Sequence, residues 1–217
     1  MTRVYLIRHA DVENPSRLLY GHLPGFPLSA RGREQAAALG RRLRDSGIRR
    51  IFHSPLERAE ETARIAAAQL EGAVELIPES ELRESEFSRY LQGVPFWQIP
   101  LRRPLWFAHK ARRGLLPGDE PIRDMGGRVL GVMYRAAEEH PEERSALVSH
   151  ADPLQAAWVL LENRLQTERE LYRKPIGRAG MLEVDLDGGR VVEVRYIAPP
   201  KSEPTGTAPG PTAPQPD

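Results

Sequence analysis

The sequence opens with residues 4–9, Val4-Tyr5-Leu6-Ile7-Arg8-His9, a short apolar run that ends in an arginine and a histidine. Four apolar residues followed at once by charged ones are typical of a buried strand that ends at the edge of a sheet. Further short strands are expected at residues 50–53, 74–77 and 146–149, and helical patterns lie between them. Strands that alternate with helices predict a mostly parallel sheet with both faces covered. The expected fold class is therefore α/β, a three-layer α/β/α sandwich.

Three helices are expected to begin at recognisable start signals. Ser29 is the expected N-cap of a helix that runs to Arg44. Ser54-Pro55-Leu56-Glu57 combines an N-cap serine, a proline for the first turn and a capping-box glutamate. Asp152-Pro153 repeats this signal with an aspartate as the N-cap. Two of these helices should start just beyond the end of a strand.

The rest of the chain divides into three unlike segments. Residues 94–121 hold two of the three tryptophans, several prolines and a group of basic residues, and are expected to form an inserted cap rather than part of the sheet. Residues 181–197 show two strand patterns around a Gly-Gly turn and predict a C-terminal hairpin. Residues 198–217 are rich in proline and predict a disordered tail. One domain is thus expected over residues 1–197.

Composition excludes several classes of protein. The chain has 217 residues, of which 40% are hydrophobic and 28% charged, enough for one sizeable core. The net charge of +1 argues against a nucleic-acid partner. The lack of cysteine excludes disulfides, thiol catalysis and cysteine-bound metal. No apolar run approaches the roughly 18 residues of a membrane helix, so no membrane partner is expected and the location expected is cytoplasmic.

Basic side chains follow three of the expected strands. Arg8 and His9 follow the first strand, His150 follows the last, and Arg58 lies one helical turn beyond Ser54. In an open α/β sheet, ligands bind beyond the carboxyl ends of the strands, where helix N-termini also lie. Two histidines, two arginines and two helix N-termini at one edge form an anion site, for which phosphate is the natural occupant.

Five blocks carry these residues in a characteristic order and spacing. They are Leu6–Ala10, Leu28–Ala36, Ser54–Ala63, Leu82–Glu84 with Gly93, and Val148–Asp152. Together they resemble the signature blocks of the histidine phosphatase superfamily, which includes the cofactor-dependent phosphoglycerate mutases. The resemblance covers residues 3 to about 165 and implies that residues 1–197 form a histidine phosphatase-like catalytic domain.

The resemblance implies a catalytic role for five residues. His9 is implied as the nucleophile that forms a phosphohistidine intermediate. Arg8 and Arg58 are implied to hold the phosphoryl oxygens, and His150 to donate to them as an imidazolium. Glu84 is implied as the general acid that protonates the leaving group and then activates water. Neither a metal nor another cofactor is expected, because arginine and histidine supply the positive charge.

The resemblance also implies a set of substrate-binding residues. They are Arg8, Asn14, Arg17, Gly21, Arg58 and Ala151. Two positions depart from the family pattern, because Ala10 and Ala151 stand where glycine is usual. An alanine is strained only where the backbone needs a positive φ, and we expect both positions to tolerate it.

Three functions remain open from the sequence. The favoured one is a phosphomonoester phosphatase that acts on a small-molecule phosphate ester. A phosphoglycerate-mutase-type phosphoryl transferase is the first alternative, and a non-catalytic phosphate-binding scaffold is the second. The intact pair of His9 and His150 argues against a scaffold, and a homodimer is left open.

Overall fold

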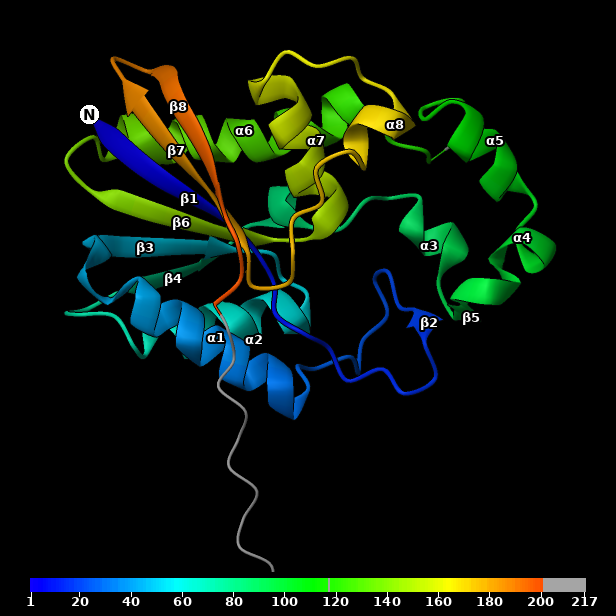
Figure 1. The fold of residues 1–217 in the computed structure, drawn as a ribbon, viewed down its shortest axis with the longest axis horizontal. Coiled ribbons are helices and arrows are strands. Elements are labelled where there is room, and N and C mark those ends of the chain that lie inside the picture. The colour runs from blue at the N-terminus through cyan, green and yellow to red at the C-terminus, as the bar shows by residue number, and fades with distance from the viewer. Residues whose placement is uncertain (117, 201–217) are drawn as a thin grey trace, which may run out of the picture.

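A six-stranded sheet forms the centre of the computed structural model, which describes residues 1–116 and 118–200 (Figure 1). The strand order is β4-β3-β6-β1-β7-β8. The strands are β1 (Thr2–Arg8), β3 (Ile48–His53), β4 (Glu75–Pro78), β6 (Arg144–Ser149), β7 (Met181–Asp187) and β8 (Arg190–Ile197). β1, β6, β3 and β4 pair in parallel, whereas β7 pairs antiparallel with both β1 and β8. The predicted mostly parallel sheet and C-terminal hairpin are confirmed.

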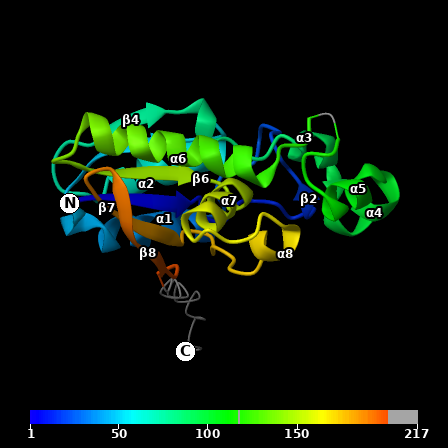
Figure 2. The same ribbon diagram turned by 90° about the horizontal axis from the view of Figure 1, so that it is seen from above.

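Four helices cover the two faces of this sheet. They are α1 (Ala30–Arg42), α2 (Glu57–Ala67), α6 (Ile122–Glu139) and α7 (Ala151–Leu161). Successive side chains of a strand point to opposite faces, so Val4 and Leu6 of β1 pack in the core under α6 and α7, while Tyr5 and Ile7 pack under α1 and α2. Figure 2 shows α6 and α1 on opposite sides of β1. The expected α/β/α sandwich is confirmed.

Helix starts agree with the sequence in one case and differ in two. Ser29 caps α1, because its side chain accepts a hydrogen bond from the amide of Gly32. The expectation that Ser54 caps α2 was wrong, since the helix begins at Glu57 with Leu56 at the N-cap position, and the Ser54 hydroxyl bonds His150 and the amide of Leu56. The expectation that Asp152 caps α7 was also wrong. His150 occupies the N-cap position, and Asp152 lies inside the first turn.

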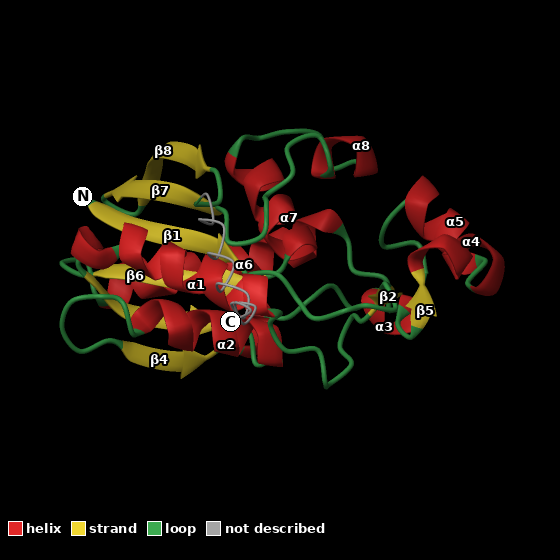
Figure 3. Ribbon diagram, turned by 60° about the horizontal axis from the view of Figure 1, so that its bottom comes forward, coloured by secondary structure: helices red, strands yellow, loops and turns green. Residues whose placement is uncertain are grey.

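Short elements gather beyond the carboxyl ends of the parallel strands (Figure 3). They are β2 (Leu18–Leu19), α3 (Ser88–Leu91), β5 (Val94–Pro95), α4 (Ile99–Arg102), α5 (Leu105–Ala111) and α8 (Glu168–Leu171), with 3-10 turns at Ser80–Leu82 and Phe96–Gln98. A further 3-10 turn, Arg44–Ser46, precedes β3 at the opposite end of the sheet. β2 and β5 pair antiparallel in a separate two-stranded sheet. The sequence did not indicate this pairing, which joins the loop after β1 to the start of the segment 94–121.

Two further expectations concern the whole chain. None of the helices that the structure describes is both long and apolar enough to cross a membrane. The predicted disordered tail lies, from residue 201 onward, outside the described residues.

Candidate active site

Adjacent parallel strands bring three polar residues together at one edge of the sheet. His9 follows β1, His150 follows β6 and Ser54 follows β3. The backbone amide of His9 donates to the carbonyl of Ser149, which extends the β1–β6 ladder past the strand ends. The imidazole centroids of His9 and His150 lie 5.2 Å apart. The convergence of the two histidines follows directly from this strand order.

The His9 ring is held in a single tautomer. Its side chain is buried, with 2% of the residue exposed. Nδ1 lies 2.7 Å from the carbonyl oxygen of Ala10, and because a carbonyl can only accept, Nδ1 carries the proton and Nε2 has a free lone pair. Burial, assisted by the charges of Arg58 and Arg8, lowers the pKa of His9 well below its ordinary value. His9 is therefore a neutral imidazole with a nucleophilic Nε2.

His150 is fully buried beside it. Its Nε2 lies 2.8 Å from the Ser54 hydroxyl oxygen, and its Nδ1 has no hydrogen-bond partner among the described residues. Burial, followed by the charge of Arg58, lowers the pKa of His150 well below its ordinary value. The imidazolium expected from the sequence therefore requires a nearby negative charge, such as a bound phosphoryl group, which favours the protonated ring.

The two arginines hold unused donors next to these rings. Arg58 is only 1% exposed, its Nη2 donates to the carbonyl of Gly21 at 2.9 Å, and its guanidinium lies 4.6 Å from the centre of the Tyr20 ring. Arg8 donates from Nη1 to the carbonyl of Ile176 at 2.7 Å. The Nε atoms of both arginines lack a partner among the described residues. Such donors suit the oxygens of a phosphate group.

The carboxyl group of Glu84 lies close to His150 and has a raised pKa. One carboxylate oxygen accepts from the amide of Ser85 at 3.0 Å, and the other lies 3.9 Å from Nδ1 of His150. Burial, followed by the negative charge of Asp152, raises the pKa of Glu84 above its ordinary value. A carboxyl group with a raised pKa keeps its proton to higher pH, which is the property a general acid needs.

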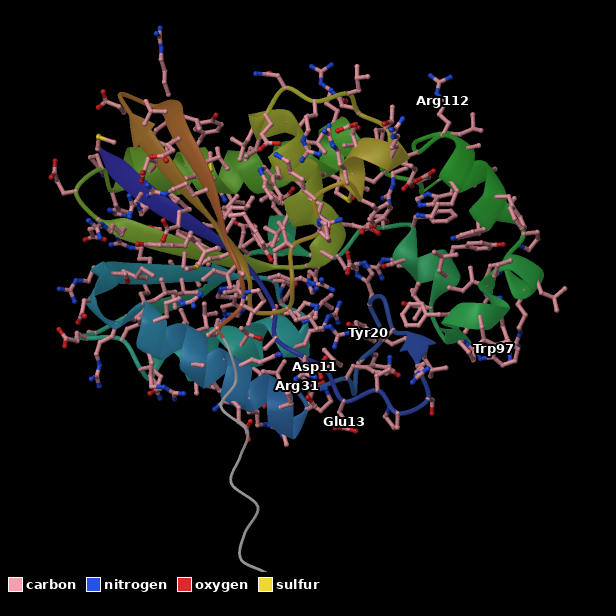
Figure 4. The ribbon with its side chains drawn as sticks, viewed as in Figure 1. Asp11, Glu13, Tyr20, Arg31, Trp97 and Arg112 are labelled. Atoms are coloured by element: carbon pink, nitrogen blue, oxygen red, sulfur yellow. The ribbon has the colours of Figure 1, made fainter. Side chains whose placement is uncertain are left out.

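A cleft of about 400 Å³ lies beside these groups: Arg8 and Glu84 line it, whereas His9, Arg58 and His150 are buried and do not. Arg8, Gly21 and Glu84 line its inner end, and side chains of the segment 94–121 line its outer end. Figure 4 shows Tyr20 between the sheet and β2, close to this inner end. Among the described residues, no group of three or more histidine, aspartate or glutamate side chains is arranged to hold a metal ion.

Two expected substrate-binding residues do not reach the cleft. The side-chain amide of Asn14 forms hydrogen bonds within its own turn. Its nitrogen donates to the carbonyl of Leu18 at 2.8 Å, and its oxygen accepts from the backbone amide of Leu18 at 3.0 Å. Arg17 is exposed, has a φ of 50° and is absent from the cleft lining. Neither side chain is therefore placed in the cleft, and a role of these two residues in substrate binding stays a prediction.

The other substrate-binding candidates lie at or beside the site. Gly21 lines the cleft and orients Arg58 through its carbonyl. Ala151 directly follows His150 as the first residue of α7. Neither Ala10 nor Ala151 is among the described non-glycine residues with positive φ, so both alanines stand there without backbone strain.

Several polar residues of the cleft were not anticipated. Arg178 lines it and forms an ion pair with Asp11. Asp152 and Tyr172 also line it, and Arg113 bonds both of them, at 2.8 Å to Asp152 and 2.7 Å to Tyr172. Each of these contacts joins segments that are far apart in the sequence, so the spacing of residues along the chain could not predict it.

Comparisons with known proteins identify the family to which the chain belongs. The family model of the histidine phosphatase superfamily, branch 1, matches residues 4–198, and the chain belongs to that family. Together the family and the site define an enzyme of phosphoryl transfer.

Among individual proteins, Rv0525 of Mycobacterium tuberculosis is 36% identical over 208 residues, which cover 91% of this chain and 96% of that protein. GpmB of Salmonella paratyphi B, named as a probable phosphoglycerate mutase, is 31% identical over 69% of this chain and 70% of its own length. Of solved structures, the alpha-ribazole phosphatase from Shigella flexneri matches with a TM-score of 0.73 at 23% identity, over 90% of this chain and 95% of that one. The last likeness confirms the fold.

Proposed function

We propose that this protein is a phosphomonoester phosphatase that works through a phosphohistidine on His9, without a metal ion or another cofactor. The observation that carries the proposal is the hydrogen bond from Nδ1 of His9 to the carbonyl of Ala10, which leaves Nε2 free to attack phosphorus. The substrate is a small-molecule phosphate ester, as the name of the alpha-ribazole phosphatase also suggests.

The first step transfers the phosphoryl group to the enzyme. The lone pair on Nε2 of His9 forms the P–N bond while the ester P–O bond breaks, and the departing alkoxide takes the proton of Glu84. Arg8 and Arg58 donate to the non-bridging oxygens, where negative charge develops. His150, protonated under the influence of that charge, adds a further donor.

The second step returns the group to water. The Glu84 carboxylate, now without its proton, accepts a proton from a water molecule as the water oxygen attacks phosphorus. The P–N bond breaks, its electron pair returns to Nε2 of His9, and inorganic phosphate leaves. The enzyme regains its starting protonation state.

A phosphoglycerate-mutase-type activity is the second candidate, favoured by the 31% identity to GpmB. Such an enzyme must hold a carboxylated substrate and exclude water from the phosphoenzyme. The scaffold alternative finds less support, because His9, His150 and both arginines converge with unused donors.

One experiment separates the three candidates. Wild-type protein, treated exhaustively with a chelator, is incubated with a panel of phosphate esters that includes p-nitrophenyl phosphate and 3-phosphoglycerate. The proposal expects release of inorganic phosphate that His9→Ala abolishes and chelation leaves intact. Faster formation of 2-phosphoglycerate than of phosphate would establish the mutase, and phosphate binding without any turnover would establish the scaffold.

A further inference from the structure

The outer part of the cleft has a wall of apolar side chains. They come from the loop after β1 and from the segment 87–106, and comprise Leu19, Phe87, Leu91, Phe96, Ile99 and Trp106. Phe87, Leu91 and Ile99 are mostly buried and pack with one another, and Trp106 packs against them. Phe96 is 53% exposed although it lines the cleft. Phe96 and Trp106 therefore expose aromatic surface to the cleft, next to a buried apolar cluster.

His109 extends this wall as a flat aromatic surface. Its ring stacks on Phe87 with the centroids 3.9 Å apart and the planes 8° from parallel. Its Nδ1 lies 2.9 Å from a carboxylate oxygen of Asp119, which fixes the ring. Burial and the charge of Arg113 lower the pKa of His109, so the ring is neutral at neutral pH.

The charged side chains at the outer end of the cleft already form ion pairs within the protein. Lys110 lines the cleft, but its ammonium lies 3.2 Å from Glu168 and 4.5 Å from the centre of the Tyr172 ring. The carboxylate of Asp152 is matched by Arg113 at 2.8 Å. A carboxylate on a substrate body would therefore meet cations that already have carboxylate partners, Glu168 at Lys110 and Asp11 at Arg178.

From these observations we infer that the substrate is a phosphate monoester whose body is uncharged, flat and apolar, seated against Phe96 and Trp106 in the outer cleft. The inference rests on the proposed phosphatase function and specifies its substrate class. A cleft of about 400 Å³ accommodates a body of one or two fused rings beside the phosphate. Small carboxylated esters, such as phosphoglycerate, leave this apolar wall uncovered.

Binding is tested first, because it does not depend on catalysis. The probes are 2-naphthylmethylphosphonate and 3-phosphonopropionate, which share a phosphonate and differ in an aromatic against a carboxylated body. Titration calorimetry on wild-type protein is expected to show the naphthyl probe binding at least about tenfold more tightly, since an aromatic body contributes about 1.4 kcal/mol or more through burial and stacking. Equal affinity, or tighter binding of the carboxylated probe, would overturn the inference.

Two tryptophan variants test where in the cleft the preference for an aromatic body arises. Trp106 lines the cleft, whereas Trp97 is 77% exposed, does not line it and lies on the outer side of the cap (Figure 4). Trp106→Ala is expected to weaken the naphthyl probe about tenfold while leaving 3-phosphonopropionate within about twofold, and Trp97→Ala is expected to change neither. A loss that is equal for both probes, or equal in the two variants, would contradict the placement.

Hydrolysis separates this inference from the function on which it rests. If the wild-type protein prefers the naphthyl probe but releases no phosphate from p-nitrophenyl phosphate, the phosphatase proposal fails. In that case the substrate class falls with it, and only the ligand preference of the cleft stands. If it hydrolyses p-nitrophenyl phosphate but favours 3-phosphoglycerate over 2-naphthylmethyl phosphate in kcat/KM, the phosphatase stands and the substrate class is wrong.

Discussion

Nδ1 of His9 lies 2.7 Å from the carbonyl oxygen of Ala10, the residue that immediately follows it. This contact determines which ring nitrogen faces a substrate, because the proton must sit on Nδ1 and the lone pair on Nε2. The acceptor is a backbone group, so its position depends on the path of the chain after β1 and not on the identity of a side chain. The orientation of the ring that the proposed mechanism needs is thus set by the end of the strand itself.

The first prediction concerns the ionisation of His9. Because burial and the charges of Arg58 and Arg8 lower its pKa, the ring should remain neutral at pH 6.5, where an ordinary histidine is half protonated. Nitrogen NMR of the labelled protein, assigned with His9→Gln, should show a protonated Nδ1 and an unprotonated Nε2 at this pH. A midpoint at or above pH 6.5 would show that the neutral nucleophile is wrong.

The second prediction tests Glu84 through the leaving group. An alkoxide is a strongly basic leaving group and needs protonation as it departs, whereas p-nitrophenolate, whose conjugate acid is far more acidic, does not. Glu84→Gln keeps the size of the side chain and removes the proton donor. The burst rate of enzyme phosphorylation should fall roughly 10²–10⁴-fold with alkyl phosphates and change little with p-nitrophenyl phosphate.

The nearby Glu86 offers a control for this variant. Its carboxylate is occupied by Arg83 and Arg89 on the outside of the site, so Glu86→Gln should leave both burst rates near the wild-type values. Equal losses for both substrates in Glu84→Gln would mean that Glu84 positions the substrate and does not donate the proton.

The third prediction uses a pair of glycines in the same loop. Gly21 has a φ of 48°, and a Cβ there would lie 2.8 Å from the carbonyl oxygen of Ser88. Gly25 has a φ of 78° and open space around it. Gly25→Ala should therefore lose about 1 kcal/mol of unfolding free energy from backbone strain alone, and Gly21→Ala should lose more, because its Cβ also meets the Ser88 carbonyl.

Only Gly21→Ala should impair the phosphate site, since the Gly21 carbonyl accepts from Nη2 of Arg58. Steady-state kinetics with p-nitrophenyl phosphate should show kcat/KM reduced at least about tenfold in Gly21→Ala and nearly unchanged in Gly25→Ala. Matching kinetics in the two variants would show that the loop does not orient Arg58.

Much of the fold and the centre of the site could be predicted from local sequence. β1 ends at Arg8 and β6 at Ser149 because apolar runs stop there, and strands that are neighbours in a parallel sheet must deliver His9 and His150 to the same edge. The order β4-β3-β6-β1 then supplies the proximity, without any information on side-chain contacts.

Most of the parts that sequence reasoning missed depend on contacts between distant segments. Ser54 has the chemistry of an N-cap, but its hydroxyl bonds His150, which lies 96 residues away. Asn14 has the chemistry of a phosphate ligand, but its amide is satisfied by Leu18 within its own turn. Arg178 reaches the cleft only because the chain returns past β1 after α8. For Ser54 and Arg178 the contacts between distant segments determine the role, whereas Asn14 is held by local hydrogen bonds that its residue type alone did not predict.

The central claim is that His9 carries the phosphoryl group, and rapid quenching of the enzyme with labelled phosphate ester tests it most directly. We predict a label that is stable in base and lost in acid, as a phosphoramidate is, that maps to the peptide containing His9. We further predict that it is absent from His9→Ala and accumulates in Glu84→Gln with p-nitrophenyl phosphate, where water activation is slowed. An acid-stable label, or one retained at the wild-type level in His9→Ala, would contradict the account.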